Sequence, residues 1–148
     1  MGSHRQPTAR SPALTTSPHT FSPGQRRALA VVAGGAVGTA ARLAVGEALT
    51  TTPTSFPWQT LAVNLVGAAL LGFLLPRLQA GARSMQYTIP LLAIGGLGAF
   101  TTFSGFVVEI VQLADAGENA TAAVYGTVSL TAGLLLALAG RRLGERTA

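Results

Sequence analysis

The sequence predicts an all-α integral membrane protein with four transmembrane helices, and three observations lead to this fold class. Hydrophobic residues make up 49% of the 148 residues and charged residues only 10%, against about 25% charged in an ordinary soluble domain. Residues 48–76, 84–108 and 119–140 contain no charged side chain. Each stretch is long enough to cross ~30 Å of hydrocarbon as a helix, and none has the polar face that a helix of a soluble bundle needs.

The chain divides into a polar tail, a four-span region and a short second tail. Residues 1–24 are rich in Pro, Ser and Thr without an apolar period, so we expect a disordered cytoplasmic tail there. The four-span region covers residues 25–143, and residues 144–148 form the C-terminal tail. We expect the spans at about 28–49, 56–75, 89–113 and 120–139, with Pro76 helping to end the second.

Several classes of protein are disfavoured by what the sequence lacks. The chain has no Cys, so it has neither a disulfide framework nor a thiolate metal site. We find no nucleophile–base pair, phosphate-binding loop or cluster of metal ligands, and we do not expect an enzyme. The basic residues are all Arg and flank the apolar spans. Anionic lipid headgroups are therefore favoured over nucleic acid as their partner.

The third span has an unusual centre. Gly95, Gly96 and Gly98 precede two adjacent threonines, Thr101 and Thr102, and these residue types are poor helix formers. A break in the helix there would free backbone groups, which are tolerated in a membrane only where protein, water or an ion satisfies them. Broken helices of transporters use such carbonyls to hold Na⁺. The alternative is a continuous helix whose glycines allow close packing.

Polar and aromatic side chains within the spans are the other candidates. Phe103 and Phe106 share a helix face, either as packing residues or with positive ring edges that attract a small anion. Asn64, in the middle of the second span, must find a partner, which is either another helix or an anion. Tyr125 and Ser129 are four residues apart, so both hydroxyls lie on one face.

Two ionisable groups lie within or near the ends of spans. Arg42 falls in the first span or near its outer end, and Glu109 falls near the end of the third. Ionisable groups in membrane-embedded segments are functional candidates by default. The alternative for both is that their charged ends reach the membrane surface. We regard Arg42 as a structural candidate.

These residues, in this order and spacing, resemble the CrcB/Fluc family of bacterial fluoride channels. The similarity runs from about residue 34 to residue 140, and its specific part is the motif of the third span. The matching positions are Gly34, Gly38 and Arg42; Thr60, Asn64 and Gly67; Gly98, Thr101, Thr102, Phe103, Ser104 and Phe106; and Tyr125 and Ser129. Gly105 departs from the family pattern, which usually has Thr or Ser there.

The resemblance implies a fluoride-selective channel in the bacterial inner membrane that lowers cytoplasmic fluoride by passive export. It implies an antiparallel dimer of two four-helix subunits, each with a break in its third helix. A structural Na⁺ at the dimer centre would be bound by the backbone carbonyls of Gly98 and Thr101. The fluoride pathway would be formed by Asn64, Thr102, Phe103, Phe106, Tyr125, Ser129 and Glu109.

Two other functions remain open from the sequence. A small four-span proton-coupled exporter of cationic compounds needs a carboxylate deep in the membrane, whereas Glu47 and Glu109 lie near span ends. The second alternative is a scaffold subunit without transport activity, which would leave the pattern of the third span unexplained.

Charge counting predicts the orientation and the partner. Seven arginines lie just before the first span, in the loop between the second and third spans, or just after the fourth span. With four spans, these three regions are on the same side of the membrane. The two loops on the opposite side have no Arg or Lys. The positive-inside rule therefore predicts that both termini are cytoplasmic. An antiparallel dimer also needs the opposite orientation. We therefore expect a homologous partner of opposite charge bias, with self-pairing as the alternative. The seven arginines are Arg26, Arg27, Arg77, Arg83, Arg141, Arg142 and Arg146.

Overall fold

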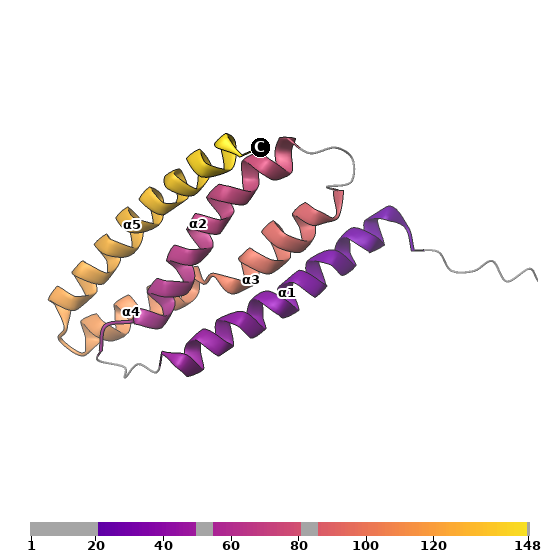
Figure 1. Cartoon of the computed structure of the whole chain (residues 1–148). Coiled ribbons are helices and arrows are strands. Elements are labelled where there is room, and N and C mark those ends of the chain that lie inside the picture. Colours follow the sequence, from indigo (N-terminus) through magenta and orange to yellow (C-terminus); the bar gives the residue numbers. More distant parts are fainter. Residues whose placement is uncertain (1–20, 50–54, 81–85, 148) are drawn as a thin grey trace, which may run out of the picture.

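The structure, a computed structural model, describes residues 21–49, 55–80 and 86–147, and its regular elements in these ranges are all helical (Figure 1). The tail expected at residues 1–24 falls mostly outside the described residues. Four stretches are long and apolar enough to cross a membrane: Pro23–Ala48, Trp58–Gln79, Ile89–Asp115 and Asn119–Arg146. The prediction of an all-helical protein with four membrane-spanning helices is confirmed. The elements in order are α1 (Pro23–Ala48), α2 (Trp58–Ala80), η2 (Ile89–Leu97), α3 (Gly98–Phe100), α4 (Phe103–Asp115) and α5 (Asn119–Arg146).

Three helices, α1, α2 and α5, extend beyond the expected apolar spans, and α5 continues to Arg146 through part of the expected C-terminal tail. At the start of α1, the Ser22 side chain accepts a hydrogen bond from the Gln25 N–H, and the Gln25 side chain accepts one from the Ser22 N–H. This capping box fixes the first turn ahead of the apolar run. Pro76 does not end α2, which continues to Ala80 with the proline inside it. The prediction that Pro76 helps to end the second helix is therefore wrong: the proline removes a single intrahelical hydrogen bond, and the remaining hydrogen bonds continue the helix past it.

Glycines bring the helices together in two close pairs. In the pair of α2 and α5, a Cβ on Gly72 would collide with the Ala137 carbonyl, and one on Gly140 with the Ala69 carbonyl. In the pair of α1 and η2, a Cβ on Gly34 would collide with the Leu91 carbonyl. Small residues let backbones approach in lipid, where packing rather than the hydrophobic effect drives helix association.

The third span changes its neighbours along its length. The segment η2 is a wide π-helix that packs against α1, whereas α4 packs against α5. Between α3 and α4, Thr101 (φ −82°, ψ 161°) and Thr102 (φ −147°, ψ 117°) have extended backbone. These two residues redirect the chain from one helix pair to the other (Figure 1).

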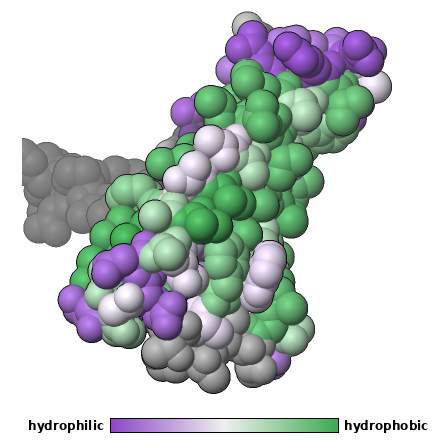
Figure 2. Space-filling model, turned by 90° about the vertical axis from the view of Figure 1, so that its left-hand side faces the viewer, coloured by the Kyte–Doolittle hydropathy of each residue, from purple (hydrophilic) through white to green (hydrophobic). Residues whose placement is uncertain are grey.

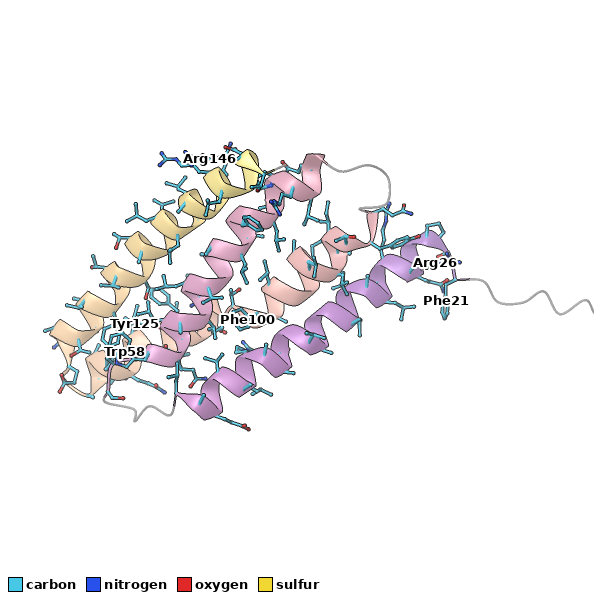
Figure 3. All side chains as sticks on the ribbon, viewed as in Figure 1. Phe21, Arg26, Trp58, Phe100, Tyr125 and Arg146 are labelled. Carbon is cyan, nitrogen blue, oxygen red and sulfur yellow. The ribbon has the colours of Figure 1, made fainter. Side chains whose placement is uncertain are left out.

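The surface is largely apolar between two polar ends. Figure 2 shows hydrophilic residues gathered at both ends of the molecule and hydrophobic residues covering the band between them. Arg26 and Arg146 lie at the end opposite Trp58 (Figure 3). A small packed cluster lies near the Trp58 end, where α2, α4 and α5 meet; it comprises Leu61, Phe106, Leu113, Ala122 and Tyr125.

Candidate functional site

The site is built around the extended backbone at Thr102. The Asn64 side chain, on α2, donates from Nδ2 to the Thr102 carbonyl oxygen over 3.0 Å and accepts at Oδ1 from the Thr102 N–H over 2.9 Å. One carboxamide thus satisfies both backbone groups of the same residue, as a neighbouring strand would. Asn64 therefore has another helix as its partner, and one Nδ2 hydrogen remains available to a further acceptor.

The end of α3 leaves carbonyl oxygens without helical partners. In a continuous α-helix the Thr102 N–H would donate to the Gly98 carbonyl, but here it donates to Asn64. Among the described residues, no hydrogen bond reaches the carbonyl of Gly98 or of Thr101. Gly98 is also exposed. Carbonyl oxygens of this kind are suitable ligands for a hard cation such as Na⁺, so these residues fit the ion that the resemblance implies here.

The Thr102 side chain caps α4. Its Oγ1 accepts a hydrogen bond from the Gly105 N–H over 3.0 Å and lies 3.3 Å from the Ser104 Oγ. A Cβ on Gly105 would lie 2.9 Å from the Thr102 Cγ2, which is closer than ordinary van der Waals contact. In this chain, the glycine that departs from the family pattern therefore leaves room for the cap.

A groove of about 330 Å³ opens beside this break, and we call it the central groove. It brings together five of the seven residues predicted for the ion pathway, from the second, third and fourth spans. Glu109 and Tyr125 do not line it, and Arg42 lies apart on α1, half-buried and without a partner among the described residues. The lining is Asn64, Ala68, Thr101, Thr102, Phe103, Phe106, Ser129, Leu130, Gly133 and Leu134.

The two phenylalanines of the central groove differ in environment. Phe106 is only 8% exposed and lies against Tyr125, with ring centroids 5.4 Å apart. Phe103 is 76% exposed, and its ring centroid lies 6.0 Å from that of Phe106. Phe106 is therefore fixed by packing within the subunit, whereas the face of Phe103 is free for lipid, an ion or a second subunit.

Ser129 is the remaining polar residue of the central groove. Its Oγ is shielded from solvent and has no hydrogen-bond partner among the described residues. A shielded hydroxyl without a partner costs free energy. Rotation of the Ser129 side chain toward the groove would let this hydroxyl bind a ligand there.

Glu109 and Tyr125 form a second polar group beyond Phe106. The Tyr125 hydroxyl donates to Glu109 Oε2 over 2.7 Å, and the Thr60 hydroxyl donates to Glu109 Oε1 over 2.5 Å. Thr60 was not among the predicted pathway residues. Its position four residues before Asn64 could have identified it, because residues at this spacing share one face of a helix.

Comparison with known proteins identifies the family. Residues 29–141 match the family model described as CrcB-like protein, Camphor Resistance (CrcB). The chain is 42% identical over 110 residues to a protein of Mycobacterium bovis named "Fluoride-specific ion channel FluC 1". The alignment covers 74% of this chain and 83% of the relative. The chain is also 42% identical over 122 residues to the "Fluoride-specific ion channel FluC" of Thermus thermophilus, covering 82% of this chain and 95% of the relative.

A third relative carries the same name. The "Fluoride-specific ion channel FluC" of Xanthomonas euvesicatoria is 39% identical over 118 residues, covering 79% of this chain and 89% of the relative. These relatives are ion channels by name and not enzymes. The family match, which runs from residue 29 to residue 141, and the identities to these relatives establish that the chain is a membrane protein belonging to the CrcB/FluC family.

Proposed function

We propose that this chain is a subunit of a fluoride-selective channel that lowers cytoplasmic fluoride by passive export. The observation that carries the proposal is the central groove, where Asn64, Thr102 and Ser129 meet the rings of Phe103 and Phe106. The names of the relatives give the ion.

The chemistry of the groove suits a small anion that is strongly hydrated. Removing water from fluoride must be offset by several hydrogen-bond donors placed along the path. The free Nδ2 hydrogen of Asn64 and the hydroxyls of Thr102 and Ser129 can act in this way. The edges of Phe103 and Phe106 carry partial positive charge and attract the ion more weakly. Weak binding at several successive places also permits the release that conduction requires.

Glu109 would act differently from the donors. Both of its carboxylate oxygens accept hydrogen bonds from hydroxyls, those of Thr60 and Tyr125. A carboxylate is an acceptor and repels an anion, so its proposed role is to orient these two hydroxyls. Tyr125 would contribute to the path through the ring that it packs against Phe106.

A structural Na⁺ forms part of the proposal. The carbonyls of Gly98 and Thr101 would be its ligands, supported by the absence of hydrogen bonds to them among the described residues. Two subunits related by a two-fold axis through this point would supply twice as many oxygen ligands. The cation would stabilise the dimer and would not be transported.

The channel would be an antiparallel dimer with both termini of this chain in the cytoplasm. The seven arginines near one side support this orientation, because positive residues in short loops stay cytoplasmic. The strong bias favours a homologous partner of opposite orientation over self-pairing. Fluoride efflux from vesicles, with and without such a partner, tests the proposed function.

A further inference from the structure

Two further grooves lie toward the arginine-rich end of the molecule, and one of them shares Ala68 with the central groove. One, the α1–η2 groove, measures about 470 Å³, and the other, the α2–α5 groove, about 490 Å³. Their linings include residues near the start of α1 and η2 and near the end of α2 and α5. These helix ends lie at the same side of the molecule (Figure 1). They are similar in volume but differ in the charge at their mouths.

The α1–η2 groove has apolar walls and a basic mouth. Ala28 and Val31 of α1 form one wall, and Ile89 and Ile94 of η2 form the other. Ile94 is 60% exposed. Arg27 and the amide of Gln86 lie at the mouth. An apolar channel that ends at a cation and an amide is complementary to an acyl chain joined to a phosphate.

In the part of the chain that the structure describes, Arg27 has no partner, whereas its neighbour Arg26 already donates one hydrogen bond. The Arg26 Nε donates to the Phe21 carbonyl over 3.2 Å. Among the described residues, Arg27 forms no hydrogen bond or ion pair. At the mouth of the α2–α5 groove, by contrast, Arg141 is paired with Glu145 at 2.7 Å. The neutralised pair has less attraction for an anion than the free guanidinium of Arg27.

We infer that the α1–η2 groove binds an anionic phospholipid of the cytoplasmic leaflet, with its phosphate at Arg27 and one acyl chain between α1 and η2. Basic pockets between transmembrane helices on the cytoplasmic side are suited to anionic headgroups. The bound chain would fill the groove beside the close contact of Gly34 with Leu91. It would thereby stabilise the pairing of α1 with η2. The choice of leaflet rests on the proposed orientation, but the inference does not depend on which ion the protein conducts.

A label inside the groove tests the inference. The sequence has no Cys, so Ile94→Cys in the full chain places one fluorophore on the groove wall, and Ala28→Cys places it on the opposite wall should the first variant fold poorly. The labelled protein is reconstituted in vesicles of phosphatidylcholine and phosphatidylglycerol, with bromine on the acyl chains of one lipid at a time. We expect stronger quenching by brominated phosphatidylglycerol than by brominated phosphatidylcholine.

Removing the guanidinium should remove this preference. Arg27→Gln should lower the relative affinity for phosphatidylglycerol about fivefold, which corresponds to about 1 kcal/mol. The matched control Arg142→Gln, at an exposed arginine of α5 outside both grooves, should leave the preference unchanged. Equal quenching by the two lipids, or the same preference in Arg27→Gln, would overturn the inference.

Three further results test the inference: the first tests the role of an unpaired guanidinium, and the other two distinguish a bound anionic lipid from a second subunit and from a free anion. Glu145→Gln frees Arg141 and should raise the preference for phosphatidylglycerol at a label on Leu138→Cys, in the α2–α5 groove; no rise would contradict the role given to an unpaired guanidinium. A disulfide formed readily between two copies of the Ile94→Cys variant would mean that a second copy covers the groove. Loss of quenching on adding inorganic phosphate alone would indicate a site for free anions. Either of the last two results would also overturn the inference.

Discussion

The side chain of Asn64 pairs with both backbone groups of Thr102, at 3.0 Å from its Nδ2 and 2.9 Å from its Oδ1. A residue in the middle of α2 thereby satisfies the peptide groups at the point where α4 begins. In hydrocarbon these groups have no water to replace the amide. Asn64 consequently combines a structural role with its proposed role as a donor.

Asn64→Leu keeps a side chain of similar size but leaves the Thr102 N–H and carbonyl without partners. We expect a loss of about 1–3 kcal/mol in the free energy of unfolding and little fluoride flux. Reversible unfolding in detergent and efflux from vesicles measure the two effects. Gln112→Leu, which removes an exposed amide on α4, is the control and should change neither. Full stability in Asn64→Leu would show that the pairing contributes nothing.

The difference in burial between Phe103 and Phe106 predicts different effects on stability. Phe106→Ala leaves a cavity against Tyr125, and we expect it to cost ~3 kcal/mol or more. Phe103→Ala removes an exposed ring, and the folded subunit should lose less than about 0.5 kcal/mol. Thermal unfolding of the two variants under identical conditions makes the comparison, and equal losses would contradict the burial of Phe106.

Replacing either Phe103 or Phe106 by an aliphatic residue should reduce conduction to a similar extent. Phe103→Ile and Phe106→Ile retain apolar bulk but remove the ring quadrupole. We expect strongly reduced fluoride efflux from both variants when each elutes at the wild-type size after purification. Unchanged efflux from both would mean that the rings serve only in packing.

Adjacent glycines of α1 provide a matched pair. A Cβ on Gly34 would collide with the Leu91 carbonyl, whereas one on Gly35 meets no atom within 4 Å. Gly34→Ala should therefore separate α1 from η2 and lower the unfolding temperature. Gly35→Ala should be neutral or slightly stabilising, because alanine favours the helix by up to about 1 kcal/mol over glycine. A larger loss in Gly35→Ala than in Gly34→Ala would contradict the packing of these two elements.

The sequence predicts the four spans well because a helix-length stretch without charge is unsuited to a helix with one face in water. It does not predict where helices end outside the hydrocarbon. There, local hydrogen bonds such as the Ser22 capping box decide, and Pro76 lies inside α2 instead of ending it. The candidate pathway residues could be chosen because polar side chains are rare in apolar spans. The pairing of these residues with one another could not be predicted from the sequence. Thr60 and Glu109, for example, are 49 residues apart and meet only in the folded chain.

The arginine distribution predicts one orientation in the membrane. Reporter domains fused to the C-terminus should be cytoplasmic in nearly all molecules, because the opposite loops have no Arg or Lys. Removing three arginines, by Arg77→Gln, Arg141→Gln and Arg142→Gln, leaves four against none and should raise the fraction of molecules in the opposite orientation without reversing the preference. An equal distribution in the wild type, together with conduction by the purified chain alone, would contradict the proposed heterodimer.

Efflux of fluoride from vesicles tests the central claim most directly. Vesicles loaded with equal amounts of fluoride and chloride are reconstituted with this chain, alone and together with a homologous subunit of opposite charge bias, and ion-selective electrodes follow both ions. In at least one of the two compositions, we predict rapid loss of fluoride with chloride retained. The reason is that the donors of Asn64, Thr102 and Ser129 surround a groove suited to the smaller ion. Equal efflux of the two ions from folded protein, or no fluoride efflux with either composition, would contradict the account.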